Sequence, residues 1–241
     1  MHDAVTRFIA EKGYPDFNIK AFFFDMDGVL FDSMPYHAAA WTRAMRENGL
    51  SFTEYDAYLH EGRTGESTID KFFLKQLHHP ADKALKEAIY AAKSAYFNAY
   101  PPVSPVPDVE ALLNDVKAYG FERYVVTGSA QESLIDNLEH YFPDIFHRDN
   151  IVSAFDVKYG KPDPEPYLIA LRKAKIDPWQ AIVVENAPLG VRSAVAAGIF
   201  TIGVNTGILR PEELQQEGAN IVLPTMQALR ELLPELIGIV P

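Results

Sequence analysis

Residues 21–33 read Ala-Phe-Phe-Phe-Asp-Met-Asp-Gly-Val-Leu-Phe-Asp-Ser. The first four are apolar and suffice for one short, fully buried strand. The run then breaks into Asp25 and Asp27, which stand two positions apart, and Gly28. In open α/β sheets, ligands bind just beyond the carboxyl ends of the strands. Two carboxylates at such an end favour a cationic ligand or a chemical role there.

Three interpretations of the two aspartates compete. An EF-hand calcium loop needs a third oxygen ligand before its glycine, whereas Gly28 follows Asp27 at once and an apolar run comes next. A turn with two solvated acids also fits, because Asp-Gly is a common turn signal. The third interpretation is a nucleophilic carboxylate beside an acid/base carboxylate, with Mg²⁺ between them and a phosphate.

The segment at residues 25–33 resembles the first motif of the haloacid dehalogenase superfamily. Its Asp-x-Asp-Gly-Val-Leu form is similar to the phosphatase and β-phosphoglucomutase branch of that superfamily. The resemblance implies further phosphate-handling residues at the ends of later strands.

Composition limits the classes of protein to consider. The 241 residues are 48% hydrophobic and 23% charged, which is typical of a soluble globular chain of one or two domains. We expect no membrane partner and a cytoplasmic location, because the sequence has neither a long apolar run nor a signal-like N-terminus. The chain has no cysteine, which excludes disulfides, thiolate catalysis and cysteine-bound metals. The net charge of −11, without a basic cluster, indicates no nucleic-acid partner. We expect a monomer.

A helical cap is predicted at residues 35–100, inserted into an α/β core made of residues 1–34 and 101–241. Helical periodicity covers three segments of the cap, residues 36–48, 67–77 and 82–100. A group of prolines then indicates the return from cap to core: Pro101, Pro102, Pro105 and Pro107. In the core, repeated alternation of strands and helices predicts a Rossmann-like parallel sheet with helices on both faces.

The cap contains a glycine-rich loop at residues 60–67, His-Glu-Gly-Arg-Thr-Gly-Glu-Ser. Its position before a helix suits an oxyanion-binding loop, and an ordinary turn with Ser67 as a helix cap fits equally well. In the family that the sequence resembles, the substrate-specificity loop of the cap lies here. Glu61, Arg63 and Thr64 are therefore candidate substrate-binding residues.

His37 and Lys93 are further candidates in the cap. Lys93 shares one helical face with Leu85, Ile89 and Phe97, so its ammonium either extends to solvent or points into the cleft at an anionic substrate. His37 by itself suits a structural or surface role. The resemblance implies a role at the interface of cap and core for a histidine at this distance from the first motif, and a lysine in this part of the cap.

Two later strand ends carry polar residues in the order of the family motifs. A strand at residues 122–126 is followed by Thr127-Gly128-Ser129, a junction that suits either a phosphate cradle or helix capping before a predicted helix at 131–140. Thr127 resembles the second motif, and Gly128 and Ser129 are candidate substrate contacts. Lys161, in Gly-Lys-Pro, is similar to the third.

The fourth motif is Glu185-Asn186, after a buried strand at 181–184. Acidic and amide oxygens there suit Mg²⁺. The pair departs from the Glu-Asp that is typical of the phosphoglucomutases. Mg²⁺ is expected to bridge Asp25, the backbone carbonyl of Asp27 and Asn186, while Glu185 orients the site or its waters. With one carboxylate replaced by an amide, we hypothesise that Glu61 reaches the metal when the cap closes.

The resemblance implies phosphoryl transfer through an aspartyl-phosphate. Asp25 is the expected nucleophile and Asp27 the acid and base, while Lys161 and Thr127 offset the charge of the phosphate. A phosphohydrolase for a small phosphomonoester or pyrophosphate is the preferred function. A β-phosphoglucomutase is the alternative, although the arginine of its cap loop would fall at Gly65. A catalytically silent phosphometabolite-binding protein is the third possibility.

Overall fold

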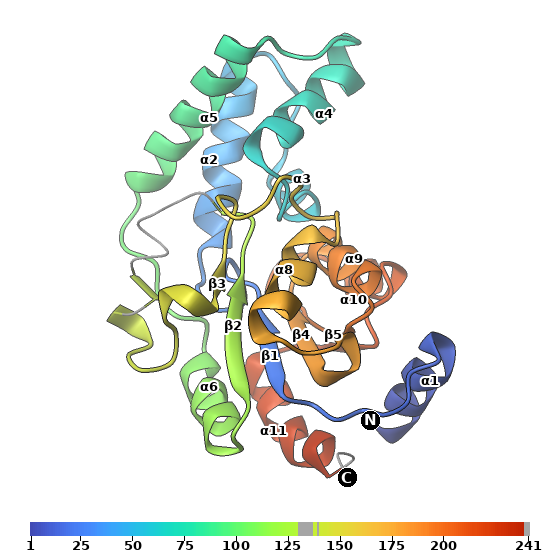
Figure 1. The fold of residues 1–241 in the computed structure, drawn as a ribbon. Coiled ribbons are helices and arrows are strands. Elements are labelled where there is room, and N and C mark those ends of the chain that lie inside the picture. The colour runs from blue at the N-terminus through green and yellow to red at the C-terminus, as the bar shows by residue number, and fades with distance from the viewer. Residues whose placement is uncertain (130–136, 139, 239–241) are drawn as a thin grey trace.

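The computed structural model describes residues 1–129, 137–138 and 140–238 (Figure 1). In these residues one sheet has the strand order β3-β2-β1-β4-β5-β6, and all neighbouring strands are parallel. The strands are β1 (Ala21–Phe24), β2 (Glu122–Val126), β3 (Ile151–Val152), β4 (Ala181–Glu185), β5 (Phe200–Val204) and β6 (Ile221–Leu223). The predicted Rossmann-like parallel sheet is confirmed.

Strand β1 lies in the middle of the sheet and is buried on both faces. Phe22 and Phe24 pack into the cluster that contains helices α6 (Val109–Ala118) and α11 (Met226–Ile237). Phe23 points the other way, into the cluster formed with α8 (Glu165–Ala174) and α9 (Pro188–Ala196). Successive side chains of a strand alternate between faces. An uninterrupted apolar run is therefore what a strand covered by helices on both sides requires.

Four helices lie between β1 and α6, and we call residues 34–98 the helical unit. They are α2 (Met34–Glu47), α3 (Glu54–Leu59), α4 (Gly65–Leu77) and α5 (Lys83–Asn98). They bury a hydrophobic cluster of their own, which includes Met45, Ile69 and Phe72. Figure 1 shows the unit above the carboxyl ends of the central strands. The predicted boundaries between cap and core, at 34/35 and 100/101, stay predictions.

Several elements were not predicted from the sequence. Helix α3 is too short to show periodicity, although Thr53 and Asp56 form a capping box at its start. The others lie in the core: α8, α11, α10 (Pro211–Gln216) and the short 3₁₀ helices η1 (Arg148–Asn150) and η2 (Pro178–Gln180). Most of the helix predicted at 131–140 lies outside the described residues. Among the described helices, none is long and apolar enough to cross a bilayer.

The N-terminal segment packs against the core far from the helical unit. Helix α1 (His2–Lys12) ends at Gly13, whose φ of 67° is left-handed, as is common at helix ends. Its Phe8 makes edge-to-face contacts with Phe17 and Phe200. These contacts give the segment a structural role.

Candidate active site

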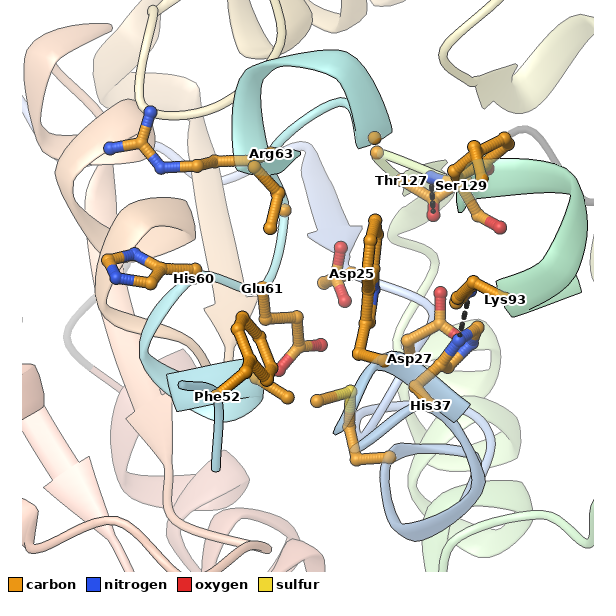
Figure 2. Close-up of a pocket in the computed structure, with 18 residues that line it drawn as sticks. Asp25, Asp27, His37, Phe52, His60, Glu61, Arg63, Lys93, Thr127 and Ser129 are labelled. Carbon is orange, nitrogen blue, oxygen red and sulfur yellow. Dashed lines mark hydrogen bonds and ion pairs between the residues drawn. The ribbon is translucent and has the colours of Figure 1, made fainter. Parts of the chain in front are cut away.

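A pocket with a cavity volume of about 70 Å³ lies between the carboxyl edge of the sheet and the helical unit. Both parts of the chain line it (Figure 2). The core contributes Asp25, Asp27, Thr127, Gly128 and Ser129, and the helical unit contributes His37, His60, Glu61, Arg63 and Lys93, among others. The fold thus gathers nine of the predicted site residues around one cavity.

Lys161 joins two carboxylates beneath the pocket. Its Nζ donates to Asp25 Oδ1 at 2.5 Å, to Glu185 Oε1 at 2.5 Å and to the carbonyl oxygen of Val126 at 2.9 Å. Burial opposes the charged ammonium, but Asp25 and Glu185 outweigh it and raise the pKa of Lys161. The lysine therefore stays protonated beside the predicted nucleophile.

The buried environment of Asp25 disfavours the ionised form of its carboxyl. It is 4% exposed, and burial, with the charges of Glu185 and Asp27, raises the pKa of its carboxyl to about 8, although Lys161 opposes the shift. A carboxylate nucleophile must be ionised. A further cation near Asp25 would favour that ionised form.

Glu185 is fully buried, and protein donors already satisfy both of its oxygens. Oε1 accepts from Lys161 and, at 2.7 Å, from the hydroxyl of Tyr167 on α8. Oε2 accepts the backbone N–H groups of Asn186 and Ala187 at 3.1 and 3.3 Å. This geometry favours the orienting role predicted for Glu185 over direct metal binding. Nothing in the spacing of the sequence pointed to Tyr167.

Asn186 has the oxygen that a cation site needs. Its Nδ2 lies 3.2 Å from Glu61 Oε2, and its Oδ1 is buried with no hydrogen-bond partner. The described residues contain no group of three or more His, Asp or Glu side chains able to hold a metal, so a site here also needs amide and carbonyl oxygens. The buried, unpartnered Oδ1 meets that need, and the residues present fit Mg²⁺.

Glu61 faces this site from the helical unit. Burial, followed by the charges of Asp25, Asp27 and Glu185, raises the pKa of its carboxyl well above the ordinary value.

Gly28 lets Asn186 approach the loop after β1 closely, because a Cβ at position 28 would lie 2.1 Å from Asn186 Nδ2. Its φ of 80° also favours glycine.

Asp27 ends a hydrogen-bonded chain that runs into the helical unit (Figure 2). Lys93 Nζ lies 2.8 Å from His37 Nδ1, and His37 Nε2 lies 3.1 Å from Asp27 Oδ1. An ammonium can only donate, so Nδ1 accepts and Nε2–H donates to the carboxylate. Ser33 donates a second hydrogen bond to the same oxygen at 2.6 Å. Lys93 is 3% exposed and points into the cleft, one of the two orientations left open above.

These contacts shift the pKa values of the chain. Burial would raise the pKa of Asp27, but its electrostatic interaction and hydrogen bond with His37 and the hydrogen bond from Ser33 outweigh it and lower the pKa. Burial lowers the pKa of Lys93 to about 8. His37 also stacks on Phe97 at a ring separation of 4.1 Å, which fixes the imidazole plane. His37 therefore acts on Asp27 directly, and Lys93 acts on it through His37. The sequence assigned both residues to substrate binding, and that assignment stays a prediction.

The remaining predicted residues have local partners. Thr127 Oγ1 accepts from the backbone N–H of Ser129 at 3.0 Å, which shapes the turn after β2. Thr64 is the N-cap of α4, and its hydroxyl accepts from the N–H of Ser67 at 3.3 Å. The guanidinium of Arg63 extends away from Asp25 and Asp27 (Figure 2) and donates to Ser67 Oγ at 3.3 Å. Substrate binding by Arg63 and Thr64 stays a prediction.

Comparison with known proteins identifies the family. A profile of haloacid dehalogenase-like hydrolases matches residues 19–198, and the chain belongs to this family. Hexitol phosphatase A of Escherichia coli is 31% identical over 188 residues, which cover 77% of this chain and 83% of that protein. The chain is an enzyme of the phosphatase and phosphomutase branch of this family.

Two solved structures show the same fold. One is a Bacteroides vulgatus chain with a provisional description as a beta-phosphoglucomutase, with a TM-score of 0.95 and 45% identity over 99% of this chain and 97% of that one. The other is beta-phosphoglucomutase from Clostridium difficile, with a TM-score of 0.75 and 26% identity over 91% of this chain and 97% of that one.

Proposed function

We propose that the protein is a Mg²⁺-dependent phosphohydrolase that acts through an aspartyl-phosphate on a small phosphate substrate. The observation that carries the proposal is the contact of Glu61 with Asn186, which joins the helical unit to the core beside Asp25 next to a cavity of only about 70 Å³. Pockets for drug-sized ligands have volumes of about 300–1,000 Å³. A pocket of this size suits a small phosphomonoester or pyrophosphate.

Asp25 acts as the nucleophile. One carboxylate oxygen forms a bond to phosphorus while the bond from phosphorus to the leaving oxygen breaks. Lys161, at 2.5 Å from Asp25, stabilises the negative charge of the nucleophile and of the transferred phosphoryl group. Thr127 shapes the turn after β2, which borders the pocket. Water then attacks the aspartyl-phosphate, and Asp25 is released with inorganic phosphate.

Asp27 transfers the proton in each half of the reaction. It gives a proton to the leaving oxygen and later takes one from the attacking water. Ser33 and His37 lower its pKa in the free site, which suits the second step. The negative charge of a bound phosphate raises that pKa again and favours the protonated form for the first step. His37, held by Lys93, keeps the carboxyl aimed at the pocket.

Three oxygens would hold Mg²⁺: a carboxylate oxygen of Asp25, the backbone carbonyl of Asp27 and Oδ1 of Asn186. Glu61 would join them directly or through water. The charge of the ion would then offset the cost of ionising the buried carboxyl of Glu61. When bound, the ion supplies charge stabilisation for the transferred phosphoryl group.

A hexose-phosphate mutase is the second candidate. It is favoured by the likeness to the Bacteroides vulgatus and Clostridium difficile structures. A mutase must also hold a second phosphate, and in this structure the guanidinium of Arg63 points away from the two aspartates (Figure 2). A silent phosphometabolite-binding protein is the weakest candidate, because Asp25, Asp27 and Lys161 are all in place. A cytoplasmic location and a monomeric state stay predictions.

Two parallel Mg²⁺-dependent assays test the proposal. One measures phosphate release from pyrophosphate and a panel of sugar phosphates. The other measures conversion of β-glucose 1-phosphate to glucose 6-phosphate with a bisphosphate primer. We expect fast release from a small substrate with negligible isomerisation. Efficient isomerisation with little free phosphate would instead establish the mutase, and no turnover in either assay would favour the binding protein.

A further inference from the structure

Two glycines from different parts of the chain meet above the pocket. Gly128 follows β2 in the core, and Gly62 lies in the loop between α3 and α4 of the helical unit. A Cβ atom on Gly128 would lie 2.6 Å from the carbonyl oxygen of Gly62, 3.1 Å from its carbonyl carbon and 3.2 Å from its Cα. These are backbone atoms and cannot rotate aside. The two loops can therefore adopt this arrangement only with glycine at position 128.

The same loop makes two further close contacts with the core. A Cβ on Gly62 would lie 3.0 Å from Cδ of Lys161. A Cβ on Gly160 would lie 3.1 Å from the methyl group of Thr64. The loop thus packs closely on Gly160 and Lys161, because the glycines at this contact have no side chains to separate the two segments. Glu61 precedes Gly62, so the separation of the loops also sets how far the Glu61 carboxylate reaches toward Asn186.

We propose that Gly128 is a specificity-determining residue: its missing side chain lets the helical unit approach until Glu61 meets Asn186, and this approach restricts the cavity to small phosphate substrates. The inference rests on the proposed function. The φ of Gly128 lies outside the left-handed region that favours glycine, so alanine can adopt the same backbone conformation at this position. Alanine also keeps the backbone N–H that a phosphate would use. The clash of Gly128→Ala is therefore with the helical unit.

The experiment compares wild type with Gly128→Ala and with Gly160→Ala as a graded control. The control adds the same methyl group at the same interface, but its nearest contact, at 3.1 Å, is the Thr64 methyl group, which needs to shift by only a few tenths of an ångström. Kcat/KM is measured with Mg²⁺ for pyrophosphate and for glucose 6-phosphate. We expect Gly128→Ala to lower kcat/KM for pyrophosphate by about 10- to 100-fold and to raise the preference for glucose 6-phosphate at least about tenfold. Gly160→Ala should stay within about threefold on both substrates.

A second measurement does not depend on activity. Amide hydrogen exchange of residues 60–64 should become at least about tenfold faster in Gly128→Ala, because the loop loses its contact with the core. Equal losses on both substrates with unchanged exchange would overturn the inference and leave Gly128 as a simple phosphate contact. Failure of Gly128→Ala to fold would also overturn it, since the clash would then lie within the core. If wild type releases phosphate from no substrate, the proposed function fails, while the exchange result still decides the role of Gly128 in closure.

Discussion

Asn186 Nδ2 lies 3.2 Å from a carboxylate oxygen of Glu61, although Asn186 follows β4 and Glu61 comes from the loop before α4. The contact joins the core and the helical unit beside the unpartnered Oδ1 of Asn186. Burial and the nearby carboxylates raise the pKa of Glu61 well above its ordinary value. A cation bound here would therefore stabilise both the ionised Glu61 and the closed arrangement.

The first prediction concerns Glu61→Gln. Removing the negative charge should raise the half-saturating Mg²⁺ concentration for turnover by about tenfold, as is common when a group close to a metal is lost. Mg²⁺ titration of initial rates measures this. Glu87→Gln is the matched control, because that glutamate on α5 is exposed and does not line the pocket. Unchanged Mg²⁺ dependence and turnover in Glu61→Gln would refute a metal role for the residue.

The second prediction concerns Asp25→Asn. The substitution keeps the shape of the side chain but removes the nucleophile, so kcat should fall at least about a thousandfold. Binding of inorganic phosphate in the presence of Mg²⁺, measured by calorimetry, should weaken far less. Asp32→Asn, at an exposed position of the same segment, should turn over like wild type. Appreciable turnover in Asp25→Asn would remove the covalent mechanism.

The third prediction concerns Lys93→Met. Burial lowers the pKa of Lys93 from 10.5 to about 8, which corresponds to a cost of about 3 kcal/mol for the charged form at pH 7. The hydrogen bond to His37 offsets part of this cost, so Lys93→Met should raise the free energy of unfolding by about 1–2 kcal/mol at pH 7. Turnover should fall, because His37 loses the donor that fixes its tautomer.

The pH dependence of this gain has a defined sign. Between pH 8 and 10.5 the unfolded chain binds a proton at Lys93 that the folded chain has released, so wild-type stability rises with pH across this window. The advantage of Lys93→Met should therefore be full below pH 8 and disappear near pH 10.5. Denaturant unfolding at several pH values measures it, with the exposed Lys83→Met as the control. An advantage that is constant with pH would contradict the assignment to a buried charge.

The fourth prediction concerns Tyr167→Phe. The tyrosine hydroxyl donates to Glu185 Oε1 at 2.7 Å, and the same oxygen accepts from Lys161. Its loss should lower the free energy of unfolding by about 1–3 kcal/mol. Because Lys161 is then held less firmly, kcat should fall about three- to tenfold with KM almost unchanged. Tyr124→Phe, at a half-buried position on β2, is the control. An effect on stability alone would limit Tyr167 to a structural role.

Some of the site was predictable because its residues follow buried strands. In a parallel sheet, the carboxyl ends of neighbouring strands lie at one edge, so Asp25, Thr127 and Asn186 had to lie close together once the strand order brought β1 between β2 and β4. Strands with continuous apolar runs were recognised without knowledge of their neighbours. Short elements such as α3 were missed, because six residues carry too little periodicity.

The network around Asp27 was predicted only in part. The sequence placed His37 and Lys93 at the cleft, but it could not show that they form a chain ending on Asp27. That chain depends on the rotation of α2 and α5 about their axes, and packing between the two helices sets this rotation. Ser33 gave no separate signal, because one serine before a helix is most simply an N-cap.

The sequence by itself determined the parallel α/β core and the identity of the carboxylates and the amide at the strand ends and of the lysine in the loop before α8. These features follow from local hydrophobic patterns and from residue types at fixed places along the chain. Only the tertiary structure decided that Tyr167 supports Glu185, that Glu61 faces Asn186 and that Gly62 rests on Gly128. Each of these contacts joins residues distant in sequence. The first depends on how α8 packs on the sheet, and the other two on how the helical unit and the core pack together, which no local pattern encodes.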